Sequence, residues 1–134
     1  MKTLKYFFVG ALLLSMQMPA MAQDVKTDVA AITKVVVDAK GDVATTKSQV
    51  KDFVKAHKKD AEALAGLGRA FMNAKNLEQA KVYAEMAIKA NKNSASGYIL
   101  HGDISVIEEN AGEAAMWYET ATMNDPKNPS SYVK

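Results

Sequence analysis

The sequence predicts an all-α protein, a solenoid of antiparallel helical hairpins that repeats every 34 residues. Shifting the chain by 34 residues lays residues 61–94 onto residues 95–128, and helix-capping residues recur at the same interval. Apolar residues after each cap recur with a period of about 3.6, as on the buried face of a helix. The chain has 134 residues, 49% apolar and 24% charged, which is ordinary globular composition.

Residues 1–22 are predicted to be a cleavable signal peptide. Lys2 and Lys5 precede an apolar run, and a small-residue cleavage pattern at residues 20–22 precedes Gln23. The run is too short for a membrane anchor, which needs about 20 apolar residues. We therefore expect an exported protein that begins near Gln23, in the periplasm or outside a bacterial cell, without stable membrane insertion after cleavage.

Removal of that segment would leave 15 basic and 15 acidic residues, and this balance disfavours nucleic-acid binding. The charge is unevenly distributed: residues 23–92 hold 13 Lys and Arg against 9 acids, whereas residues 93–134 hold 2 against 6. Opposite charges could steer a partner or favour self-association, although solvated helix faces are the simpler interpretation. The absence of cysteine excludes thiol catalysis and thiolate metal sites.

Helix starts are predicted at Asp42, Asn76 and Asn110, which have the side chains preferred at helix N-caps. Gln79 and Glu113 follow two of these caps by three residues, so each is expected to complete a capping box. Short polar links at residues 57–60, 91–94 and 125–128 end the helices that follow the caps. Each unit is therefore predicted to be a helical hairpin.

Small residues predict where the two helices of a hairpin touch. Gly68 and Gly102 are 34 residues apart in predicted helix interiors, where glycine costs up to about 1 kcal/mol relative to alanine. We expect close approach of the partner helix at Ala80 and Ala114 to explain them.

These residues resemble the tetratricopeptide repeat (TPR), whose 34-residue pattern is W-x2-L-G-x2-Y…A-x3-F…P. The resemblance implies a right-handed superhelix, with TPR repeats at residues 61–94 and 95–128. The structural repeat positions are Leu64, Leu67, Gly68, Phe71, Ala80 and Ala87 in the first and Tyr98, Gly102, Ala114, Tyr118, Ala121 and Pro126 in the second.

Residues 23–60 are predicted to form a degenerate or capping TPR-like hairpin, in which Lys34 replaces the glycine and Thr46 the alanine. A β-hairpin with strands at residues 35–37 and 43–46 is the alternative. Residues 129–134 resemble the start of a further, truncated repeat, so we expect the sequence to be the N-terminal portion of a longer product.

The residues predict neither an enzyme nor a metal or cofactor site. The histidines, His57 and His101, are 44 residues apart and lack metal-ligand spacing. His101 is expected to be packed and hydrogen-bonded, and His57 to be exposed in a link. The acidic residues between 103 and 113 lack the order of a calcium loop, and no nucleophile is paired with a base.

The TPR resemblance implies a concave groove, lined by the first helix of each repeat, that binds a protein or peptide. Its predicted lining consists of Glu62, Arg69, Met72, Asn73, Ser96, Ile99, Asp103, Val106 and Ile107. Arg69 is expected to pair with a carboxylate of the partner. Ile99, Val106 and Ile107 are expected either to contact apolar side chains of the partner or to pack against an adjacent unit.

The sequence thus predicts an exported, non-enzymatic scaffold for protein–protein interaction. Two alternatives remain open: an N-terminal accessory or attachment region of a larger exported enzyme or receptor, and a self-assembling structural protein.

Overall fold

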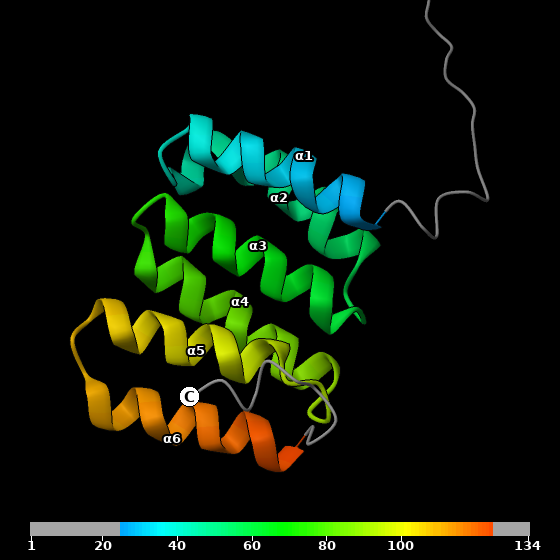
Figure 1. The fold of residues 1–134 in the computed structure, drawn as a ribbon. Coiled ribbons are helices and arrows are strands. Elements are labelled where there is room, and N and C mark those ends of the chain that lie inside the picture. Colours follow the sequence, from blue (N-terminus) through cyan, green and yellow to red (C-terminus); the bar gives the residue numbers. More distant parts are fainter. Residues whose placement is uncertain (1–24, 125–134) are drawn as a thin grey trace, which may run out of the picture.

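A computed structural model describes residues 25–124, which form six α-helices and no strand (Figure 1). The helices are α1 (Val25–Asp38), α2 (Val43–Ala56), α3 (Ala61–Asn73), α4 (Leu77–Ala90), α5 (Ser96–Ile107) and α6 (Ala111–Asn124). The all-α prediction is therefore confirmed. The β-hairpin alternative is wrong, because residues 35–37 lie in α1 and residues 43–46 in α2.

Four predictions lie outside the described residues. These are the signal peptide at residues 1–22, the polar link at residues 125–128, the repeat position Pro126 and the truncated repeat at residues 129–134.

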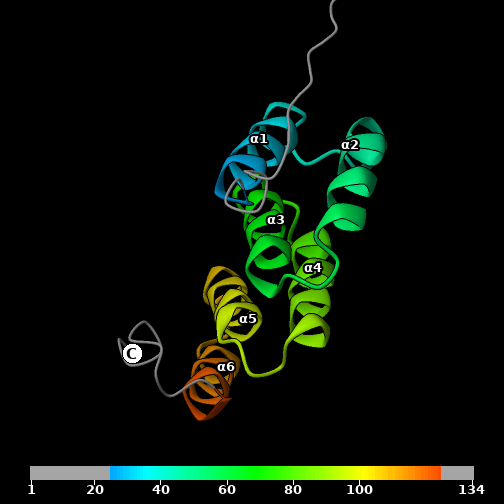
Figure 2. The same cartoon turned by 90° about the vertical axis from the view of Figure 1, so that its right-hand side faces the viewer.

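The six helices form three hairpins that follow one another along the molecule (Figures 1 and 2). The first helices of successive hairpins are direct neighbours, since α3 packs against both α1 and α5. Helix α4 packs against α3 and also against α5. The arrangement places equivalent positions of α3 and α5 side by side.

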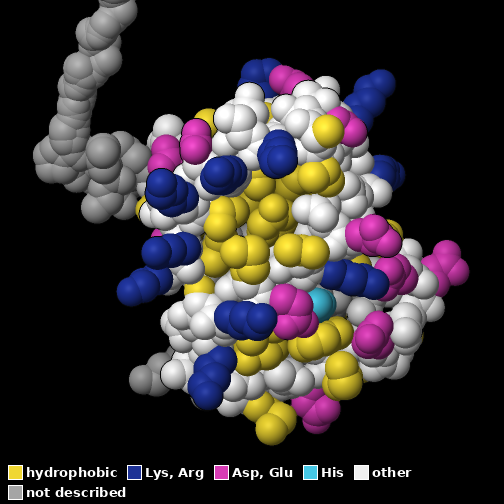
Figure 3. Space-filling model, turned by 180° about the vertical axis from the view of Figure 1, so that it is seen from behind, with side chains coloured by type: hydrophobic (Ala, Val, Ile, Leu, Met, Phe, Trp, Pro, Cys, Tyr) yellow, Lys and Arg dark blue, Asp and Glu magenta, His cyan; other side chains and the backbone are white. Residues whose placement is uncertain are grey.

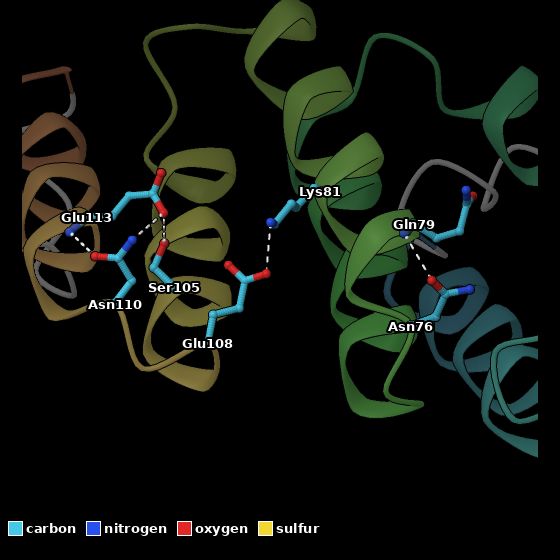
Figure 4. Close-up of polar contacts among 7 residues, drawn as sticks. All are labelled: Asn76, Gln79, Lys81, Ser105, Glu108, Asn110 and Glu113. Atoms are coloured by element: carbon cyan, nitrogen blue, oxygen red, sulfur yellow. Dashed lines mark hydrogen bonds and ion pairs between the residues drawn. The ribbon is translucent and has the colours of Figure 1, made fainter.

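The three predicted N-caps are confirmed, and each side chain accepts a hydrogen bond from the backbone N–H three residues later. The pairs are Asp42 with Thr45 at 2.8 Å, Asn76 with Gln79 at 3.2 Å and Asn110 with Glu113 at 3.1 Å. Figure 4 shows the second and third of these pairs. These bonds satisfy donors that the first helical turn leaves unpaired.

The reciprocal half of the capping box does not form. The backbone N–H of Asn76 donates to the Phe71 carbonyl at 2.9 Å, and that of Asn110 donates to the Ser105 carbonyl at 2.9 Å. Both bonds are of the Schellman type, which closes the end of the preceding helix. The donor that the box would use is therefore already occupied.

Each hairpin turn has a charged residue in the left-handed region that usually favours glycine. The φ angles are 57° at Lys40, 72° at Lys75 and 62° at Glu109. In the first turn Gly41, which directly precedes the cap residue Asp42, also has a positive φ angle, of 76°.

Both glycines lie close to the partner helix of their hairpin, but the predicted contact residue is found only for Gly68. A Cβ at Gly68 would lie 3.1 Å from the Ala80 carbonyl oxygen, as predicted, but its nearest neighbour would be Leu100 Cδ2 of α5 at 2.5 Å. A Cβ at Gly102 would lie 2.5 Å from the Tyr118 ring, so the nearest neighbour is this aromatic side chain rather than Ala114. The prediction for Gly102 identified the correct helix and the wrong residue.

The first hairpin is more open than the second. Helix α4 presents Ala80, Ala84 and Ala87, which are fully buried and permit close packing on α3. At the equivalent positions α2 carries the larger Thr46, Val50 and Phe53. Helix α1 accordingly packs more extensively against α3 than against its own partner α2, which stands apart in Figure 2.

The described repeat positions lie inside the molecule, and all are buried except Tyr118, which is partly buried. They contribute to two hydrophobic clusters. The larger one extends from Ile32 in α1 to Ile104 in α5. The smaller one consists of Ala95, Tyr98 and Ala121, with partly buried residues packed around them.

Candidate interaction surface on α3 and α5

The predicted groove residues of α5 lie on one side of the helix. Ser96, Ile99 and Asp103 follow one another at intervals of three and four residues, and Val106 and Ile107 lie three and four residues after Asp103, so the five side chains share one side of the helix. The predicted residues of α3 are Glu62, Arg69, Met72 and Asn73. Because α3 and α5 are neighbours, the two sets flank one surface, which we call the α3/α5 face.

Two polar contacts connect residues of this face that are 34 positions apart. Arg69 Nη1 donates to Asp103 Oδ2 at 2.7 Å, and Ser96 Oγ donates to Glu62 Oε2 at 2.6 Å. Arg69 was expected to pair with a carboxylate of a partner, but Asp103 of the same chain occupies this role. A guanidinium has five N–H donors, and the Arg69 side chain is 39% exposed, so donors remain for a further acceptor.

Asp103 is engaged on both carboxylate oxygens. Besides Arg69, it accepts a hydrogen bond from the Tyr118 hydroxyl through Oδ1. Burial, and then the adjacent Asp103 carboxylate, raise the pKa of Tyr118 to about 12, so this phenol stays protonated near neutral pH. Asp103 therefore joins α3, α5 and α6 and holds the Arg69 side chain in place.

The apolar residues of the face differ in exposure. Val106 is 55% exposed and Ile107 is 50% exposed. In contrast, Ile99 packs against the smaller hydrophobic cluster and Met72 against the larger one. Of the three predicted aliphatic contacts, two are thus accessible and one is mainly structural.

His101 is packed and hydrogen-bonded, as predicted. It is 7% exposed, its Nε2 lies 3.0 Å from Glu85 Oε2, and its ring stacks on Trp117 with centroids 4.1 Å apart. Burial lowers the pKa of His101, and the Glu85 carboxylate partly opposes this effect.

His57 differs from its prediction. Its side chain is only 12% exposed, because the ring packs against Phe53 at 4.6 Å and Nε2 lies 3.0 Å from Asp28 Oδ2. Asp28 lies in α1, 29 positions earlier in the chain. The sequence around His57 alone therefore does not predict this contact.

The part of the chain that the structure describes was searched for metal-ligand clusters and for membrane-spanning helices. Among residues 25–124, no three or more His, Asp or Glu side chains cluster closely enough to hold a metal ion. No helix within this range combines the length and apolar character needed to cross a membrane.

Sequence reasoning missed a second surface, a hydrophobic groove between α2 and α4 on the opposite side of the molecule (Figure 3). It has a volume of about 590 Å³ and is lined mainly by Val50, Val54, Phe71, Val82 and Met86. The signal that could have indicated it is the replacement of small by larger inward-facing residues on α2. Its lining comes from three helices, so no single helical stripe reveals it.

Comparison of the chain with models of known protein families gives no match, and comparison with curated proteins gives none either.

Proposed function

We propose that the protein is an exported, non-enzymatic scaffold, a right-handed TPR-like solenoid that binds a peptide or protein segment along the α3/α5 face. The observation that carries this proposal is the position of exposed Val106 and Ile107. They lie one turn after Asp103 on the same side of α5, and Asp103 holds Arg69 beside them.

This surface suits an extended segment or an amphipathic helix. Val106 and Ile107 would bury apolar side chains of the partner, and the remaining N–H donors of Arg69 would bind a backbone carbonyl or a carboxylate. Because Arg69 is already held by Asp103, less side-chain freedom is lost on binding.

The polar groups of the face favour binding over catalysis. Both Asp103 oxygens have partners, and Tyr118 has a pKa raised to about 12 and donates to Asp103. Tyr118 keeps its own proton near neutral pH and is therefore not poised to take one from a substrate.

A pull-down from a bacterial envelope extract tests the proposal, with wild-type protein and two matched variants. Ile107→Asp places a charge on the α3/α5 face, whereas Met123→Asp does so on α6 at a residue that is 75% exposed. We expect wild type and Met123→Asp to retain the same envelope protein or peptide and Ile107→Asp to lose it while keeping its helical circular dichroism. Retention of nothing by wild type, or equal retention by all three, counts against the proposal.

Export is tested separately by expressing the gene in a bacterium and determining the N-terminal residue. We expect a periplasmic or secreted product that begins near Gln23, and an unprocessed cytoplasmic product would contradict export.

Sequencing the reading frame beyond Lys134 tests the accessory-region alternative, which an appended catalytic or receptor domain would favour.

A further inference from the structure

The groove between α2 and α4 is a continuous apolar surface that the described chain leaves uncovered. Val43 and Val82 at its sides are each 45% exposed, and Phe71 and Val50 form its floor. The lining of α2 extends from Val43 to Lys55, which corresponds to about 18 Å of helix. Figure 3 shows this hydrophobic patch with basic side chains along one edge.

The groove follows from the packing of the first hairpin. Thr46, Val50 and Phe53 face inward at positions where α4 has alanine, so α2 does not approach α3 as α4 approaches α5. A gap therefore remains between α2 and α4, and the side chains of Phe71 and Tyr83 lie along it. These two rings stack with centroids 5.6 Å apart, which gives the floor a fixed shape.

Charged side chains border the groove asymmetrically. Lys47, Lys51 and Lys55 line the α2 side, and within residues 25–124 none of them makes an ion pair. On α4, by contrast, Lys81 pairs with Glu108 at 2.8 Å (Figure 4), and Glu85 lies 3.0 Å from His101. The charged residues that line the groove are thus three lysines, all on α2.

We propose that this groove is a second binding surface, which takes an acidic amphipathic helix of a partner protein. The three lysines are spaced by four residues, or about 6 Å along the axis. A docked helix with Asp or Glu at every third or fourth position would repeat its carboxylates at nearly the same interval. Its apolar side would cover Val50, Val54 and Val82.

The charge pattern favours this partner over other occupants. A fatty acid has one carboxylate, which one lysine satisfies. The chain's own residues 1–24 and 125–134 contain one acid each, and no helix of residues 25–124 carries three acids spaced by three or four positions. Residues 1–134 therefore do not supply the complementary row, either within one chain or from a second copy of these residues.

The test uses the full chain and a fluorescent synthetic peptide of about 18 residues with a leucine stripe flanked by glutamate at every fourth position. A control peptide has lysine in place of each glutamate. Dodecanoate is a second control, an amphiphile with a single carboxylate. Anisotropy titrations at low and high salt measure the affinities. We expect the glutamate peptide to bind, the lysine peptide to bind at least about tenfold more weakly, and salt to reduce the difference.

Two pairs of variants locate the binding. The triple variant Lys47→Glu, Lys51→Glu and Lys55→Glu is compared with Lys58→Glu, Lys59→Glu and Lys92→Glu, which changes the net charge by the same amount at other exposed residues. Val82→Asp is compared with Val37→Asp, because these valines are 45% and 43% exposed on different surfaces. We expect the first member of each pair to weaken binding at least about tenfold and the second to weaken it less than about twofold.

Equal effects of the two members of either pair would overturn the proposal, and so would equal binding of both peptides. Dodecanoate that binds as tightly as the glutamate peptide would assign the groove to an amphiphile. A dimer of the wild-type chain that only the Lys47, Lys51 and Lys55 variant dissociates would assign it to a second copy. Because Ile107→Asp leaves this groove intact, its effect on peptide binding separates this proposal from that for the α3/α5 face.

Discussion

Arg69 and Asp103 are 34 residues apart in the chain, and their side chains meet at 2.7 Å between α3 and α5. With exposures of 39% and 30%, the pair is screened by solvent, so its coupling energy is expected to be below about 1 kcal/mol. Urea unfolding of Arg69→Ala, Asp103→Ala and the double variant measures this coupling. A coupling of several kcal/mol would show that the pair is a main structural element rather than a positioned binding group.

Glycine substitutions should have opposite effects at two sites. A Cβ at Gly102 would lie 2.5 Å from the Tyr118 ring, so Gly102→Ala is expected to destabilise the protein by about 1 to 3 kcal/mol and Gly102→Leu by at least as much. At Gly112 the nearest atom would be 4.0 Å away, so Gly112→Ala should stabilise α6 by up to about 1 kcal/mol. Chemical denaturation checks both values. Equal effects would show that Tyr118 moves aside at little cost.

The stability of the protein is expected to fall as the pH drops below about 6.5. Burial lowers the pKa of His101, so between its folded pKa and the usual value of 6.5 the unfolded chain binds more protons than the folded one. The loss should begin near pH 6.5 and level off below the folded pKa. Urea midpoints of wild type and His101→Leu between pH 8 and pH 5 measure it, and we expect a smaller decrease for the variant. Parallel curves would exclude His101 as the cause.

Alkaline titration should reveal the raised pKa of the Tyr118 phenol. Its pKa is raised to about 12, so the folded chain keeps a phenol proton that the unfolded chain loses near pH 10, and stability should decline between these two values. Ultraviolet absorbance of wild type and Tyr118→Phe measures the ionisation. We expect the difference between them to titrate near pH 12, and a difference that titrates near pH 10 would contradict the burial and hydrogen bond of this side chain.

Local signals in the sequence predicted the helices well. Asp42, Asn76 and Asn110 begin helices because their side chains cap backbone donors only a few residues away. The contact of Gly68 with Ala80 could be predicted because both lie in one hairpin, whereas the closer contact with Leu100 of the next hairpin could not.

Contacts that depend on how whole helices are placed could not be predicted. The His57 contact with Asp28 and the contact of the Tyr118 ring with Gly102 depend on how one helix is oriented about its axis relative to its neighbour. Local sequence patterns do not determine this orientation. The α2/α4 groove depends on the distance between helices, which the sum of inward side-chain volumes determines. The nine residues of the α3/α5 face were placed on the correct helices, but the mutual pairing of Arg69 and Asp103 was not foreseen.

The stacking of Trp117 on His101 gives the third hairpin its own optical reporter. Trp117 is the single tryptophan of the chain, and it packs against the smaller of the two hydrophobic clusters. Its emission therefore reports the opening of α5 and α6, whereas far-ultraviolet circular dichroism reports all six helices. Two transitions that fail to coincide would mean that the terminal hairpin opens before the rest of the fold.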